Sequence, residues 1–123
     1  ILPLEKSGKL NLIGAGEKPL GFDLLTVNGH TEKMMLPILE FKNKTFVFVS
    51  DLIPTAGHVR VPFIMGYDTR PLLTLQEKAF FLERAAKEKF FLFLQHDVNN
   101  EVIDIRREND RFKLNKTFKL EDI

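Results

Sequence analysis

Two short, intensely apolar runs constrain the fold of this chain more than any other feature. Residues 46–49 read Phe-Val-Phe-Val, and residues 90–94 read Phe-Phe-Leu-Phe-Leu. Unbroken apolar runs of this length are typical of strands that are buried on both faces of a sheet. A sheet that contains such strands needs a covering layer on each side.

The segment between the two runs contains the most strongly periodic stretch of the sequence. Residues 74–89 predict a helix, because apolar residues recur at spacings of four, three and four. The apolar stripe consists of Leu75, Ala79, Leu82 and Ala86, with Phe81 and Ala85 beside it. Thr74 and Glu77 have the spacing of a capping box. One helix covers only one face of a sheet, so the other face is expected to need more chain or a second molecule.

Weaker patterns predict further strands around this centre. They are residues 9–13, 22–27, 33–41, 101–106 and 111–114 or beyond, the last two forming a hairpin around Asn109-Asp110. Pro37 argues for an edge strand or a bulge. Residues 51–71 lack a clean period but are rich in apolar side chains, so they are expected to form an ordered wall. The predicted fold is α/β (α+β by class), a mixed sheet with one main helix.

Composition limits the chemistry that the chain can perform. At 123 residues it is the length of one domain, and its formal net charge of +1 argues against nucleic acid or a membrane surface as partner. There is no cysteine, so any metal must be held by nitrogen and oxygen ligands. The chain begins with Ile rather than Met, and we expect it to be processed or a piece of a longer protein.

Three positions carry the side chains of a candidate site. Asp51 and His96 follow the two apolar runs, and His30 lies in the Gly-containing turn Asn28-Gly29-His30-Thr31. Ligand crevices of α/β sheets lie at the carboxyl ends of strands, where Asp51 and His96 are expected. Imidazole and carboxylate at such places are typical metal ligands.

Each position also has a simpler interpretation, and the residues alone leave the choice open. Asp51 would start the next loop by accepting backbone N–H groups. His96 would be a structural strand-end residue, with the adjacent Asp97 acting as an outer partner or a turn residue. His30 would be exposed in an Asn-Gly hairpin turn.

Two further residues are candidates for the wall of a pocket. His58 lies within the long irregular segment, and Tyr67 lies near its end. The alternative for His58 is a loop histidine that is hydrogen-bonded to the backbone. Asp68, next to Tyr67, is expected to be structural and to form a turn.

Taken in order, Gly29-His30-Thr31, Ser50-Asp51-Leu52 and His96-Asp97 resemble the C-terminal half of a metallo-β-lactamase-fold hydrolase. The branch with lactonases and methyl parathion hydrolase-like enzymes is the most similar, over residues 20–98. The resemblance implies an αββα sandwich, of which this chain is a partial domain. It also implies two divalent metal ions, commonly zinc, between the two halves.

Carried over residue by residue, His30 resembles a ligand of the first metal, Asp51 the carboxylate that bridges both metals, and His96 a ligand of the second. The implied reaction is attack of a metal-bound hydroxide on a small ester or lactone. The family's His-x-His-x-Asp-His motif is absent, and its Gly-His-Thr-Pro-Gly-His reads Gly-His-Thr-Glu-Lys-Met at residues 29–34.

The three ligands therefore form an incomplete set. We expect the chain alone to be inactive and to bind metal weakly or not at all, with the missing N-terminal half or a self-associating copy as its partner. One alternative is a non-catalytic, self-associating αβ module. Another is a phosphoester- or nucleic-acid-processing member of the family, which the near-neutral charge counts against.

Overall fold

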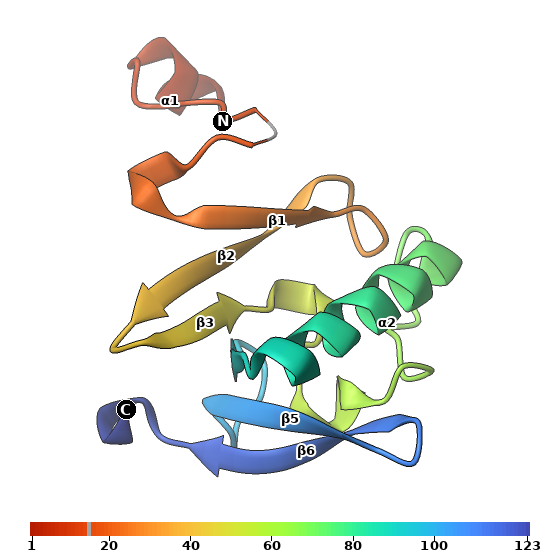
Figure 1. Cartoon of the computed structure of the whole chain (residues 1–123). Helices are drawn as coiled ribbons and strands as arrows, with labels where there is room; N and C mark the ends of the chain where they lie inside the picture. Colours follow the sequence, from red (N-terminus) through yellow and green to blue (C-terminus); the bar gives the residue numbers. More distant parts are fainter. Residues whose placement is uncertain (15) are drawn as a thin grey trace.

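The computed structural model describes residues 1–14 and 16–123 and folds them into a six-stranded sheet with one long helix against one face (Figure 1). The strands lie side by side in chain order, and only β3 and β4 run parallel. The elements are α1 (Leu2–Lys6), β1 (Asp23–Val27), β2 (Met34–Phe41), β3 (Lys44–Phe48), α2 (Pro71–Glu88), β4 (Phe91–Phe93), β5 (Val102–Glu108) and β6 (Arg111–Phe118). The predicted mixed sheet with one main helix is confirmed.

The β3–α2–β4 unit is the part of the fold that positions the candidate site. Phe46, Val47 and Phe48 of β3 pair in parallel with the three residues of β4. A parallel pair needs a crossover connection, which α2 and the irregular segment before it provide. The carboxyl ends of β3 and β4 therefore lie at the same edge of the sheet.

The hydrophobic core lies between α2 and the sheet. It is built from Leu36, Val47, Leu92 and Ile103 on the strands and from Phe81, Leu82 and Ala85 on the helix, all of them buried. Residues 51–71 add Leu52, Ile53 and Val59 to this core and form two short 3-10 turns. The expected ordered wall is confirmed, because these apolar side chains anchor the segment.

The opposite face of the sheet is open in this chain. Phe46 and Phe48 pack against Phe91 and Phe93 with ring centroids 5.1 Å apart in both pairs, yet all four rings are only half-buried. We call this surface the open Phe face; it includes a hollow of about 430 Å³ lined by Leu39, Phe41, Phe46, Phe48, Phe93, Leu120 and Ile123. The prediction that both runs are buried on both faces is wrong for the chain by itself, because α2 covers only one side.

The beginning of α2 differs from the prediction. The helix starts at Pro71, which suits the first helical position because its missing N–H would be unpaired there anyway. Thr74 and Glu77 form no capping box: the Thr74 hydroxyl bonds to the Arg70 carbonyl, and the Glu77 carboxylate reaches the loop after β1. The buried stripe is shifted by one position and contains Thr74, Lys78, Phe81, Leu82 and Ala85.

Two strand predictions are also corrected. Residues 9–13 are irregular and mostly exposed, because no neighbouring strand reaches them. The strand that contains Pro37 is β2, which lies inside the sheet between β1 and β3 rather than at an edge. Pro37 is tolerated because its pairing with β3 has already ended at Ile38, so no bond to that strand is lost. The predicted hairpin around Asn109-Asp110 is confirmed.

Candidate functional site

Asp51 and His96 meet at the shared edge of β3 and β4. Asp51 lies in a 3-10 turn, Ser50–Leu52, that directly follows β3, and His96 follows β4 after two residues. The His96 Nε2 atom is 2.9 Å from Asp51 Oδ1. The rule that places ligands at the carboxyl ends of parallel strands thus accounts for this contact.

The third candidate, His30, comes from the six-residue connection between β1 and β2. Its Nε2 atom is 3.4 Å from Asp51 Oδ2, so each oxygen of the Asp51 carboxylate faces one imidazole. The exposed fractions of the side chains are 13% for His30, 26% for Asp51 and 55% for His96. His30 is therefore not the exposed turn residue of the simpler interpretation, and the site opens to solvent on the side of His96.

The other ring nitrogen of His30 contacts a buried carboxylate. His30 Nδ1 is 2.8 Å from Asp68 Oδ1, and the Asp68 side chain has no exposed surface. The ring of Tyr67 meets His30 edge to face, with centroids 5.9 Å apart. Tyr67 is itself 68% exposed, so this side of His30 also borders solvent. Sequence patterns did not predict the pairing of Asp68 with His30, because the two residues are 38 positions apart in the chain.

His58 contacts a residue of its own turn. Its Nδ1 atom is 2.8 Å from the Thr55 hydroxyl, within the turn that contains both residues. Burial lowers the pKa of His58, and the positive charge of Lys78 lowers it further, whereas Asp68 acts in the opposite direction. The structure therefore does not bring His58 to the three candidate ligands.

A buried lysine lies on α2. The Lys78 side chain is fully buried on α2, and its amine donates a hydrogen bond to the Phe63 carbonyl. Burial lowers the pKa of Lys78 to about 8, although the charge of Asp68 partly offsets this effect. The spacing of Lys78 could have indicated its burial, because it lies one helical turn after Thr74 and one before Leu82, both on the buried face of α2.

Asp97 organises the loop that carries His96. Its carboxylate accepts hydrogen bonds from the backbone N–H groups of Ala56, Asn99 and Asn100, at 2.8, 3.0 and 3.0 Å. Burial alone would raise the pKa of Asp97, but these bonds outweigh burial and lower it. Of the two interpretations that the sequence left open, the turn residue agrees with these contacts.

The donor atoms fit divalent metal ions in chemistry and spacing. Two ligands of a tetrahedral zinc ion at about 2.1 Å lie roughly 3.4 Å apart, close to the His30–Asp51 and His96–Asp51 distances of 3.4 and 2.9 Å. Within residues 1–14 and 16–123, however, no group of three or more His, Asp or Glu side chains surrounds a single point. The two imidazoles face different oxygens of the Asp51 carboxylate.

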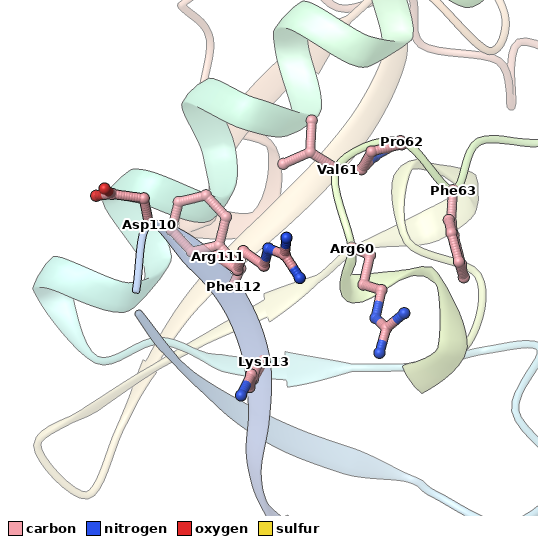
Figure 2. Close-up of a pocket in the computed structure, with 8 residues that line it drawn as sticks. All are labelled: Arg60, Val61, Pro62, Phe63, Asp110, Arg111, Phe112 and Lys113. Carbon is pink, nitrogen blue, oxygen red and sulfur yellow. The ribbon is translucent and has the colours of Figure 1, made fainter. Parts of the chain in front are cut away.

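The hollow drawn in Figure 2 is separate from this site. It has a volume of about 460 Å³ and lies between residues 60–63 and the tip of the β5–β6 hairpin at residues 110–113. Arg60 and Arg111 reach into it, and Phe63 and Phe112 supply apolar walls (Figure 2). None of the three candidate ligands lines it. In the described part of the chain, no helix has the length and hydropathy of a membrane span.

Three solved structures with a similar fold are a hydrolase of the β-lactamase superfamily, a probable metal-dependent hydrolase and a lactonase. The hydrolase AbOPH of this superfamily matches 96% of the chain with a TM-score of 0.83 and 17% identity. A probable metal-dependent hydrolase from Staphylococcus aureus matches 92% of the chain, with a TM-score of 0.76 and 20% sequence identity. The third structure is AidC, a dizinc quorum-quenching lactonase in complex with a product, N-hexnoyl-L-homoserine. It matches 92% of the chain, with a TM-score of 0.76 and 19% sequence identity.

The chain therefore has the fold of one part of a β-lactamase-superfamily hydrolase, and the fold resemblance expected from the sequence is confirmed. The match covers 42, 42 and 40% of the three solved chains, so the present chain spans about two fifths of their length. No protein-family model and no curated protein matches the sequence.

Proposed function

We propose that this chain supplies one side of a two-metal site in a hydrolase that cleaves a small ester or lactone. The observation that carries the proposal is the Asp51 carboxylate, which presents one oxygen to His30 and the other to His96. A carboxylate offers two oxygens and a negative charge, which suits a group shared between two cations. Divalent ions at such a place supply Lewis acidity and a nucleophile at neutral pH.

The proposed roles follow from the position of each side chain. His30 would hold the first ion, His96 the second, and Asp51 would bridge them. Tyr67, which is exposed beside His30, would contact the substrate. The role of His58 as a pocket residue stays a prediction; its ring is bonded to Thr55.

We further propose that a second layer covers the open Phe face and brings the remaining ligands. The half-buried Phe rings and the hollow of about 430 Å³ support this proposal, because apolar sheet faces of this kind are normally packed against another layer. The cover would be the N-terminal half of the fold or a second copy of the chain. The share of the solved structures that the chain matches agrees with a missing layer.

Metal titration of the purified chain tests the ligand set. Co²⁺ is added to the wild-type chain and to the Asp51→Asn variant, and binding is followed by visible absorption and by the NMR signals of the histidine rings. We expect weak binding that perturbs His30 and His96, and a loss of at least tenfold in affinity for the variant. Binding that perturbs neither histidine, or that Asp51→Asn leaves unchanged, would contradict the proposal.

Catalysis is tested separately. The chain alone is expected to show no metal-dependent esterase or lactonase activity above a metal-free control, because its ligand set is incomplete. Activity should appear when the chain is expressed with the covering half of the fold, and should depend on Asp51. Metal-dependent activity of the isolated chain would overturn the claim that the site is partial.

The rival proposal is a non-catalytic, self-associating module. The open Phe face favours it, because this surface can pair with a copy of itself. Sedimentation and elemental analysis separate the two proposals: a stable dimer that carries no metal and gains none on titration favours the module.

A further inference from the structure

We propose that Asp68 and Glu77 form a positioning device for the loop that carries His30, in which Asp68 fixes the ring and Glu77 fixes the backbone. Neither residue would touch metal or substrate. The proposal rests on the proposed function in one respect, namely that His30 is a metal ligand. The positioning itself is a property of the metal-free chain and can be measured there.

Asp68 determines which nitrogen of His30 carries the proton. Its Oδ1 atom is 2.8 Å from His30 Nδ1, whereas Asp51 Oδ2 is 3.4 Å from Nε2. A carboxylate can only accept a hydrogen bond, so the shorter contact assigns the proton of the neutral ring to Nδ1. The Nε2 lone pair is then directed toward Asp51, which is the orientation that a metal ligand requires.

The burial of Asp68 shows that this contact is more than a turn-forming bond. The Asp68 side chain has no exposed surface, and within residues 1–14 and 16–123 its one side-chain hydrogen-bond partner is His30. Its second oxygen, Oδ2, is buried with no hydrogen-bond partner among the described residues. A turn-forming aspartate would instead accept backbone N–H groups, as Asp97 does in this chain. Burying a carboxylate for one bond to an imidazole is costly, and it is expected where that imidazole must be held.

Glu77 holds the backbone on the other side of His30. Its two carboxylate oxygens accept the N–H groups of Asn28 and Gly29 at 2.8 and 2.9 Å. These bonds cross from the second turn of α2 to a loop that lies 49 and 48 residues earlier in the chain. The expected capping box is absent because Glu77 is used here instead.

The segment before α2 completes the clamp. The Gly29 carbonyl accepts the backbone N–H of Arg70 at 2.8 Å, and the His30 carbonyl accepts the backbone N–H of Thr69 at 3.1 Å. The Thr69 hydroxyl lies 2.9 Å from the same His30 carbonyl. Backbone and ring of His30 are therefore held from one contiguous stretch of chain, residues 68–77.

The first test needs no substitution. The chain is labelled with ¹⁵N at histidine, and the ring nitrogens are observed without metal at a pH where their shifts show neutral rings. We expect the Nδ1-protonated form for His30. Observation of the Nε2-protonated form would overturn the proposal, even if every variant failed to fold.

Variants then separate positioning from general stability. Asp68→Asn and Glu77→Gln are compared with Glu83→Gln, a control on the same helix whose carboxylate pairs with Arg107 at the surface. We expect Asp68→Asn to change the tautomer balance of His30 and to weaken Zn²⁺ binding by about 10- to 100-fold. Glu77→Gln should broaden the signals of residues 28–30 and weaken binding less. Unchanged ring signals of His96 and unchanged circular dichroism show that the fold is kept.

The outcomes distinguish the two proposals. One outcome is that the wild-type chain shows the Nδ1-protonated form, that Asp68→Asn alters it, and that neither the wild type nor any variant binds Zn²⁺. In that case the proposed metal site is wrong and the positioning proposal stands. If Zn²⁺ binds through His30 and Asp68→Asn changes neither the tautomer nor the affinity, the positioning fails and the metal site stands. An equal effect from Glu83→Gln would also overturn the positioning proposal.

Discussion

A Cβ atom on Gly29 would lie 2.3 Å from the backbone nitrogen of Thr74, so the loop before His30 rests directly on the first turn of α2. No L side chain fits this contact without movement of backbone. The position needs glycine for close approach, since no positive φ is recorded for Gly29.

Gly29→Ala is therefore expected to push the loop away from α2. We expect a loss of about 1–3 kcal/mol in the free energy of unfolding, the range for overpacked sites. The ring signals of His30 should shift as well. Gly66→Ala is the matched control, because a Cβ there meets nothing within 4 Å. Urea denaturation of both variants checks the prediction, and equal stabilities would contradict it.

Lys78 is expected to make stability rise with pH on the alkaline side. Its pKa is about 8 in the folded chain against an ordinary value of 10.5, so between these values the unfolded chain binds a proton that the folded chain does not. Stability then increases from pH 8 to 10.5, by an amount on the order of 3 kcal/mol. Below pH 8 the full cost of burying the charge is present.

The comparison with Lys78→Met isolates this effect from the other lysines. The variant should lack the extra rise, so that its stability relative to wild type falls as the pH goes from 8 to 10. Chemical denaturation at several pH values measures the difference. Parallel pH profiles for the two proteins would show that Lys78 does not titrate in this range.

Asp97 is expected to stabilise the chain only while it is ionised. Its hydrogen bonds lower its pKa below the ordinary value of 3.8, so its contribution is complete above that value and is lost as the pH falls further. Asp97→Ala should lower stability at pH 7 by about 2 kcal/mol, the scale of hydrogen bonds to a charged group. The gap between variant and wild type should narrow below pH 3.8. Asp110→Ala, at an exposed carboxylate that pairs with Arg107, serves as control and should change stability little.

The open Phe face is expected to drive association of the isolated chain. Phe48→Ser should shift the chain toward monomer, because it removes apolar area from this surface. Phe80→Ser, which changes a 73% exposed ring on the outer side of α2, should not. Sedimentation equilibrium reads the result. A wild-type chain that stays monomeric at high micromolar concentration would contradict the prediction.

Local patterns in the sequence predicted the elements whose partners are close in the chain. The β5–β6 hairpin follows from alternation and turn residues. The strand predicted at residues 22–27 is observed as β1, Asp23–Val27. The contact between Asp51 and His96 follows from strand ends alone, because β3 and β4 are parallel neighbours. His30 was a candidate because of its Gly-containing turn, and only its role as a ligand of the first metal came from the family resemblance.

The side-chain partners that the sequence could not predict depend on contacts between residues far apart in the chain. Glu77 fits a capping box by its spacing, but the unpaired N–H groups of Asn28 and Gly29 offer better partners once the sheet has formed. Lys78 lies on the buried face because the stripe is shifted by one position. The partner of Asp68 is an imidazole that precedes it by 38 residues.

The position of α2 determines how the arrangement of His30, Asp51 and His96 can come apart. The helix lies between β3 and β4 in the chain, the two strands that Asp51 and His96 follow. Its first turns also hold the His30 loop. Fraying of this end of α2 would release His30 while the sheet stayed intact, because helix ends open at far lower free energy than a packed core. Amide hydrogen exchange of Gly29, whose N–H is bonded to Glu77, should therefore be faster than that of buried Leu82. Its rate would report how often the site comes apart without unfolding.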